Sequence, residues 1–392
     1  MNLLERRRLI TSLVVILKNK LNLNIPKKLL SYLQDLNYKF DNDFNSNNIN
    51  VFKIDQKNID NELLNLKKII NLEDILHDVI DLNGIELKKE FEKIIDNPFA
   101  SLRVKRDIIN NLNNVLNYSI KNINITIISK RYEYDVLKNV ISILNLFNLI
   151  TKKENKYVIN IFLSEEKKVI SNNKYLNADN INSGSTLPTY FITIWRKEEL
   201  YKVLIHELIH YLEIDMKEHQ NKFRVLYKDI KLVDNKCNPN EAYTELLALI
   251  FFNYWKFIKK GSEISKLENF LKYSLLIEMG WSYFQIGKIL NFFGCFDKYE
   301  DLFRHDCEFK QKTNVLSYFI LKTYLLFNIS NTINCINFNT LKQSNMLTNK
   351  LLNTIDLSNY EFSKIINWCI NYYKNTSYKL NHSTLRMTCF DS

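Results

Sequence analysis

Residues 203–212, with the sequence VLIHELIHYL, hold two histidines and a glutamate in an otherwise apolar run. His206 and His210 are four residues apart, so on an α-helix their side chains lie about 40° apart on one face. Two imidazoles at this spacing can both reach one zinc ion at about 2.0–2.1 Å. Glu207 follows the first histidine, where its carboxylate can take a proton from a zinc-bound water. The segment therefore predicts a zinc site with a general base beside it.

The alternative interpretation is that both histidines are core residues and that their spacing is accidental. The chain has only six histidines among 392 residues, which makes a chance pair on one helical turn uncommon. Between Val203 and Leu212 the only charged residue is Glu207. These apolar flanks predict a helix buried beneath a sheet.

A catalytic zinc needs a third protein ligand and one open position. Residues 238–245 read NPNEAYTE, in which Glu241 follows the start of a predicted helix and Glu245 lies one turn later. Together the two motifs resemble the gluzincin, or thermolysin-like, branch of the zincin metallopeptidases, whose second motif is Asn-Glu-x-x-x-Asp. The resemblance implies that Glu241 is the third zinc ligand and that Glu245 orients His206.

The chain departs from the gluzincin pattern in two respects. Glu245 stands where an aspartate is usual, and the interval between His210 and Glu241 is longer than in close members of that branch. Glu241 and Glu245 can also be an ordinary solvated pair on one helix face.

His219 competes with Glu241 for the third position. Metzincins place a third histidine shortly after HExxH, and DNA-repair proteases of the SprT type also carry a later histidine. On a continuous helix His219 would lie on the face opposite His210, so it can bind the metal only if the helix ends near Asp215. The simpler interpretation is a solvated surface histidine.

Four small or polar residues are candidates for substrate binding: Asn182, Ser183, Gly184 and Ser185. In zincins the substrate backbone pairs with an edge strand that precedes the metal helix, and the resemblance implies this role here. A plain turn is the alternative. The oxyanion of peptide hydrolysis also needs a donor, for which Tyr243 and Arg386 are candidates beside Tyr254 and His305.

The fold class expected from the sequence is α+β and predominantly helical, because four prolines and six glycines leave long helices uninterrupted. Alternating or β-branched runs predict strands at 123–129, 156–164 and 190–195. The small, polar residues of 181–186 predict an extended segment. We expect a zincin-like core with a small mixed sheet over the HExxH helix. Three regions are predicted: an N-terminal helical region of unknown role, a catalytic core and a helical region walling the cleft, at 1–122, 123–260 and 261–392.

The composition of the chain restricts its expected binding partners and its expected cellular compartment. The net charge is +11, but the lysines are scattered and carry no nucleic-acid motif, which argues against nucleic acid as the main partner. The six cysteines form no close pair, as expected of free thiols in a reducing compartment. Neither a secretory signal nor a membrane span is recognisable. We expect a cytoplasmic protein, in the host cytoplasm or the virion if the chain is viral.

The function expected from these observations is zinc-dependent peptide hydrolysis with one Zn²⁺ per chain and a polypeptide substrate. The segments GWSYFQIGKIL (280–290), TNVLSYFILKT (313–323) and STLRMT also resemble uncharacterised HExxH proteins encoded by large cytoplasmic DNA viruses. Two alternatives stay open. One is a non-catalytic, basic viral scaffold or nucleic-acid binder with a structural zinc, and the other is a DNA-linked protease of the SprT type.

Overall fold

A computed structural model of the chain shows an α+β protein that is predominantly helical with one small mixed sheet, so the predicted fold class is confirmed. The structure describes residues 15, 23–45, 93–94, 96–131, 133–170, 174–216, 228–235, 237–304, 306–339, 341, 344–375 and 384–390.

The chain forms two compact units that are interleaved in sequence. The first comprises Met1–Leu33, Lys167–Ser183 and Glu198–Ser392, and the second comprises Gln34–Glu166 and Gly184–Lys197. The sequence predicts three consecutive regions. The units differ from those regions because the short segment Gly184–Lys197 joins a sheet whose other strands lie earlier in the chain.

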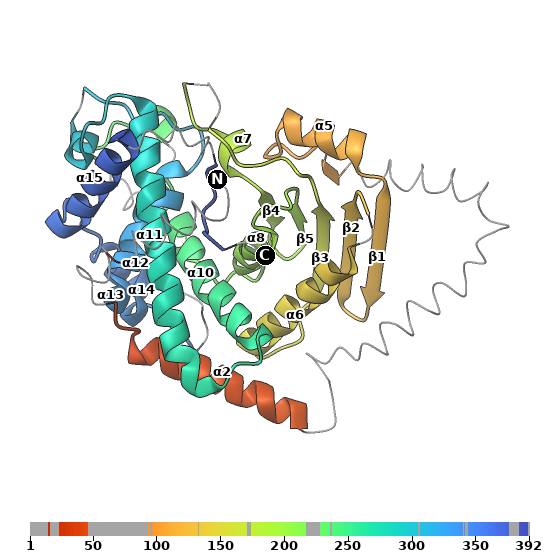
Figure 1. The fold of residues 1–392 in the computed structure, drawn as a ribbon. Coiled ribbons are helices and arrows are strands. Elements are labelled where there is room, and N and C mark those ends of the chain that lie inside the picture. Colours follow the sequence, from red (N-terminus) through yellow and green to blue (C-terminus); the bar gives the residue numbers. More distant parts are fainter. Residues whose placement is uncertain are drawn as a thin grey trace. The chain divides into compact units, whose positions relative to one another are not determined.

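The second unit is built on a five-stranded sheet whose strands lie side by side in Figure 1. In the order β1-β2-β3-β5-β4, the three inner strands run parallel and each outer strand is antiparallel to its neighbour. The strands are β1 (Asn114–Ile120), β2 (Ile123–Ser129), β3 (Tyr157–Phe162), β4 (Gly184–Leu187) and β5 (Phe191–Ile194). Alternating or β-branched sequence predicts β2, β3 and β5, and the structure confirms these three strands.

Strand β1 lies within 1–122, the region that the sequence predicts to be helical, and that prediction is wrong at 114–120. The strand pairs with β2 along its whole length, from Asn114 opposite Ser129 to Ile120 opposite Ile123. A neighbouring strand thus decides the conformation of a segment whose own pattern is weak. Just before it, α5 (Leu102–Asn111) is helical as predicted.

Helices α5 and α6 also belong to the second unit. Helix α6 (Tyr134–Thr151) connects β2 to β3, because two parallel strands need a crossover. From α5, Val104 and Ile108 join a fully buried cluster with Ile128, Phe162 and Trp195. Burying such side chains contributes about 1.5–3 kcal/mol each, so this cluster fixes the helix on the sheet.

Helix α10 (Pro239–Lys259) is the central helix of the first unit. It packs against α8 (Leu200–Tyr211), α11 (Leu267–Phe293), the π-helical segment η5 (Leu316–Leu321) and α12 (Lys322–Phe327). Figure 1 shows α10 beside α11. Most of its residues from Ala242 to Phe257 are buried. A helix that is buried on all sides is mostly apolar. Its few polar side chains have no access to water, so each needs a hydrogen-bond partner within the protein.

The other elements are mostly short helices. They are α2 (Lys27–Asn45), which begins in the first unit and ends in the second, α7 (Ala178–Ile181), η2 (Val233–Asn235), η3 (Ile264–Lys266), η4 (Tyr299–Phe303), α13 (Ile329–Asn334), α14 (Asn345–Leu352) and α15 (Tyr360–Asn375). Within the described ranges, every helix is too short or too polar to cross a membrane.

The C-terminal segment 384–390 is anchored inside the first unit. The carbonyl of Arg386 accepts hydrogen bonds from the side chains of Trp281 (3.0 Å) and Gln285 (2.8 Å) on α11. The amide of Thr388 donates to the Glu199 carboxylate (2.6 Å) at the start of α8. The segment therefore ties α11 to the amino end of α8.

Candidate metal centre

A polar stripe on α8 faces two carboxylates of α10. Lys202, His206 and His210 follow one another at four-residue intervals, so they lie along one side of an otherwise apolar helix. Glu241 and Glu245 have the same spacing on α10. Lys202 at one end of its stripe pairs with Glu245, and His210 at the other end contacts Glu241, so the two stripes run in opposite directions.

The triad of His206, His210 and Glu241 brings three donor atoms together. The two Nε2 atoms are 3.2 Å apart, and Glu241 Oε2 lies 3.4 Å from that of His206 and 3.6 Å from that of His210. Donors bound at 2.0–2.1 Å on the corners of a tetrahedron are about 3.3 Å apart. The three atoms therefore have the separations of one face of a zinc coordination tetrahedron.

The charge of the triad also suits a cation. Burial lowers the pKa of His206 and His210, but the surrounding carboxylates outweigh burial and raise the pKa of both imidazoles above the ordinary value. Burial raises the pKa of Glu241, but the two histidines outweigh it and hold that pKa well below its ordinary range. The raised histidine pKa reflects an excess of negative charge, which a divalent cation would neutralise.

A carboxylate faces the remaining ring nitrogen of each histidine. His206 Nδ1 lies 2.9 Å from Glu245 Oε1, and His210 Nδ1 lies 2.7 Å from Asp215 Oδ2. The His210–Asp215 contact is a hydrogen bond, whereas His206 Nδ1 makes a close polar contact with Glu245 that lacks hydrogen-bond geometry. Both carboxylates favour the tautomer in which Nδ1 carries the proton and Nε2 is left for a metal. Both rings are therefore oriented as metal-binding histidines usually are.

Asp215 reaches His210 because the chain reverses directly after α8. Glu213 adopts a left-handed conformation (φ 52°) and its amide donates to the carbonyl of His210 (3.0 Å). The side chain of Asn240 then holds the turn, donating to Asp215 Oδ2 (3.0 Å) and accepting from the amide of Met216 (2.8 Å). Asn240 thus fixes the end of α8 to the start of α10.

Lys202 neutralises Glu245 from the same helix that carries the ligands. Its ammonium pairs with Glu245 Oε2, and the two side chains are 1% and 3% exposed. Burial raises the pKa of Glu245, but Lys202 and His206 outweigh burial and hold that pKa far below its ordinary range. Glu245 is therefore an ionised acceptor for His206.

Glu207 and Tyr318 are two further reactive groups beside the triad. The buried Glu207 is close enough for its charge to act on His210 and on Tyr318. The Tyr318 hydroxyl hydrogen-bonds to Glu241, and its ring lies edge-on to His206 with centroids 6.2 Å apart. Burial and the nearby carboxylates raise the pKa of Tyr318 well above its ordinary value. The hydroxyl is therefore protonated at neutral pH.

Comparison with known proteins relates the chain to a viral protein. It is 26% identical over 352 residues to an uncharacterised protein of Acanthamoeba polyphaga mimivirus, and the aligned region covers 82% of this chain and 88% of the viral protein. This similarity confirms the viral part of the predicted resemblance, whereas the zincin part stays a prediction. No family model and no solved structure matches the chain.

The predicted substrate-binding residues fall on both sides of the boundary between the units. In the first unit, Asn182 Oδ1 accepts from Thr313 (3.4 Å), and Ser183 is buried. In the second unit, Gly184 begins β4, which lies at one end of the described strand order, and Ser185 accepts from Asn97 (2.9 Å). The β4 strand is extended as predicted, and its role in substrate binding stays a prediction.

The predicted oxyanion donors are engaged elsewhere or deeply buried. Tyr243 is fully buried on α10, and the Tyr254 hydroxyl donates to the carbonyl of Leu33 (3.0 Å). The guanidinium of Arg386 donates to the carbonyl of Phe390 (3.1 Å). The other candidates, His219 as third ligand and His305 as oxyanion donor, lie outside the described residues.

Three contributors to the site were missed in the sequence. Lys202 had a visible signal, since it precedes His206 by four residues on an apolar helix. Asp215 reaches His210 only through the turn after α8, and Tyr318 comes from a distant segment, so neither had a spacing signal. Tyr318 lies in η5, a short π-helical segment, and such segments are frequent at functional sites.

Proposed function

We propose that the protein is a zinc-dependent metallopeptidase. The observation that carries the proposal is the triad of donor atoms, which has the separations of a tetrahedral face and has Glu207 beside it. His206, His210 and Glu241 would hold the metal. Zinc bound there would polarise a substrate carbonyl and lower the pKa of a water towards about 7.

Glu207 and Tyr318 have complementary roles in the proposed reaction. The Glu207 carboxylate accepts a proton from the attacking water and then delivers it to the leaving amine. Tyr318 is a protonated donor beside Glu241, so its hydroxyl stabilises the negative charge that develops on the substrate carbonyl oxygen. The tyrosine takes the place of the donors expected from the sequence, because it is the hydroxyl that contacts the triad.

The composition of the site favours catalysis over a structural zinc. Structural zinc sites are usually closed by four protein ligands, whereas catalytic sites use three and leave one position open. Within the described part of the chain, the candidate group consists of two histidines and one glutamate. His210 and Glu241 keep 17% and 16% exposure, so solvent reaches the ligand side chains.

Cleavage of a peptide library by the zinc-loaded chain tests the proposal. Glu207→Gln should keep zinc and lose turnover, because the amide cannot accept the proton. Tyr318→Phe should reduce kcat by about 10²–10³-fold, and the exposed Tyr360→Phe on α15 serves as the matched control. Undiminished cleavage by Glu207→Gln would exclude this mechanism.

A further inference from the structure

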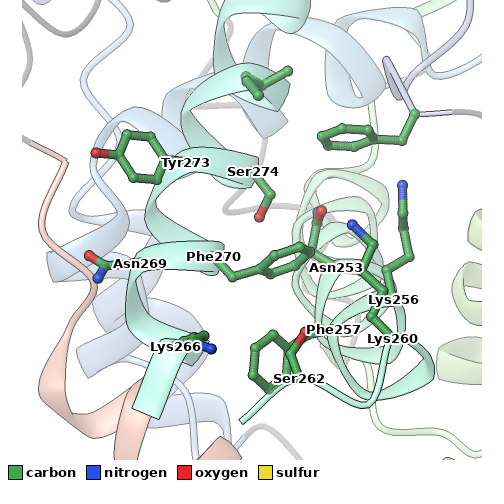
Figure 2. Close-up of a pocket in the computed structure, with 12 residues that line it drawn as sticks. Asn253, Lys256, Phe257, Lys260, Ser262, Lys266, Asn269, Phe270, Tyr273 and Ser274 are labelled. Carbon is green, nitrogen blue, oxygen red and sulfur yellow. The ribbon is translucent and has the colours of Figure 1, made fainter. Parts of the chain in front are cut away.

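A pocket between α10 and α11 lies away from the metal centre and has its own chemistry. Its volume is about 520 Å³, within the range of small-molecule sites. Figure 2 shows Phe270 and Ser274 pointing from α11 towards α10, whereas Tyr273 and Asn269 lie on the other side of α11. The lining residues are Asn253, Lys256, Phe257, Lys260, Ser262, Lys266, Asn269, Phe270, Tyr273, Ser274, Ile277 and Phe390.

The rim of the pocket is cationic. Lys256, Lys260 and Lys266 line it, and none of the twelve described lining residues is acidic. Lys266 also contacts Glu263, 3.2 Å away on the exposed outer side. Lys260 Nζ lies 5.4 Å from the ring centroid of Phe270. Three ammonium groups around one opening favour a ligand with a multiply charged anionic group, such as a phosphate.

The wall of the pocket is aromatic and its floor holds a buried hydrogen-bond acceptor, so the pocket has more features than an anion alone would use. The rings of Phe257 and Phe270 contact each other, with centroids 5.4 Å apart, and form an aromatic wall. At the floor, Asn253 is 0% exposed and its Nδ2 donates to the carbonyl of Leu249 (2.8 Å). This bond orients the amide so that Oδ1 is left as a buried acceptor without a hydrogen-bond partner among the residues that the structure describes. Such an acceptor calls for a donor from a ligand.

We propose that this pocket binds a nucleoside phosphate whose base carries an exocyclic amino group. The phosphates lie at the lysine rim, the base contacts the aromatic wall, and the amino group donates to Asn253 Oδ1. A single ligand of this kind matches all three features of the pocket. Its phosphates match the lysines, its flat base matches the aromatic wall, and its amino group matches the buried acceptor.

The pocket is physically separate from the metal centre. Asn253 follows Glu245 by eight residues on α10, a rise of about 12 Å along the helix. Binding at the pocket can therefore be measured without turnover, and the inference does not depend on the proposed peptidase activity.

Isothermal titration calorimetry of the full chain with ADP tests the inference. IDP is the matched ligand, because its base presents a carbonyl oxygen to Asn253 instead of an amino group. We expect ADP to bind about tenfold more tightly than IDP, and adenosine and inorganic phosphate each to bind more weakly than ADP. ADP affinity should also fall as salt rises.

Three variants locate the binding site. The double variant Lys260→Gln/Lys266→Gln should weaken ADP binding by about tenfold or more, because both ammonium groups are lost at the rim. The control Lys259→Gln removes the same kind of charge from the same helix outside the lining and should leave ADP affinity within about twofold. Asn253→Leu should abolish the preference for ADP over IDP. If that buried variant does not fold, the exposed lysine variants still decide the test.

Several results would contradict the proposed binding of a nucleoside phosphate, each in a different way. Failure of ADP to bind at millimolar concentration, or binding unaffected by the double lysine variant, would overturn the inference. Equal affinity for ADP, IDP and inorganic phosphate would reduce the pocket to a simple anion site and exclude recognition of a base. Binding of an acidic peptide in place of ADP would likewise overturn it.

Discussion

His206 Nδ1 lies 2.9 Å from Glu245 Oε1, and the other oxygen of this carboxylate pairs with Lys202, one helical turn before the histidine. A candidate metal ligand is thus oriented by a carboxylate whose own charge is balanced from the ligand's helix. All three side chains are less than a tenth exposed, so solvent screens these interactions little.

Replacing Lys202 should destabilise the fold and weaken metal binding together. Lys202→Met leaves the buried Glu245 carboxylate without its closest cation, so we expect the free energy of unfolding to fall by about 3–5 kcal/mol. Urea unfolding measures this loss. The exposed Lys364→Met on α15 is the control, with an expected change within about 0.5 kcal/mol.

A double variant distinguishes the effect of the unpaired Glu245 charge on stability from the effect of lost packing. Adding Glu245→Gln to Lys202→Met removes the unpaired carboxylate, so part of the lost stability should return. A double variant no more stable than Lys202→Met alone would show that the ion pair is not the cause.

Asp215 should matter for zinc affinity more than for folding. Asp215→Asn keeps the shape of the side chain but removes the charge that faces His210 Nδ1. We expect zinc affinity to fall by about 10–100-fold, measured by competition with a chelating dye. Glu213→Gln, an exposed carboxylate two residues earlier, is the matched control. Equal zinc affinity in the two variants would argue against an orienting role for Asp215.

Much of the fold can be predicted from the sequence, because in those segments the local hydrophobic pattern matches the burial in the structure. The β-branched alternation of 123–129 matches β2, and the apolar run of 203–212 matches the carboxyl half of α8. Strand β1 was mistaken for helix because its conformation depends on pairing with β2, which a local pattern does not contain.

The residues of the candidate site also fall into those that the sequence predicts and those that it does not. His206, Glu207, His210 and Glu245 lie on helices with regular spacing. The structure brings the two histidines to Glu241 and sets Glu245 against His206. Asp215 arrives through the turn after α8 and Tyr318 comes from a distant segment, so their positions follow from tertiary packing, which one sequence does not display.

Gly287 should tolerate no side chain where α11 packs on α15. A Cβ atom there would lie 2.9 Å from the carbonyl carbon of Cys369, closer than real contacts allow. Gly287→Ala gains about 1 kcal/mol of helix propensity, but overpacking costs about 1–3 kcal/mol. We expect net destabilisation in urea unfolding, and an unchanged or more stable variant would contradict the close packing.

Lys288 should make stability rise with pH. Burial lowers the pKa of Lys288 from 10.5 to about 7. Between these values the unfolded chain binds a proton that the folded chain does not, so the free energy of unfolding increases with pH across the window, by about 1.4 kcal/mol per pH unit at most.

Urea unfolding of the wild type and Lys288→Met at pH 7, 8 and 9 checks the sign. The comparison isolates Lys288 from other titrating groups, because only its contribution differs between the two chains. The variant should show the shallower rise of stability with pH. Equal slopes would mean that Lys288 is protonated in the folded chain.

The most direct test of the metal centre is the amount of zinc bound per chain, measured by inductively coupled plasma mass spectrometry. The wild type, Glu241→Ala and His219→Ala should be compared after remetallation and removal of loose metal. We predict about one zinc in the wild type and in His219→Ala, and loss of zinc in Glu241→Ala. A wild-type chain without zinc, or zinc that depends on His219 and not on Glu241, would contradict the proposed site.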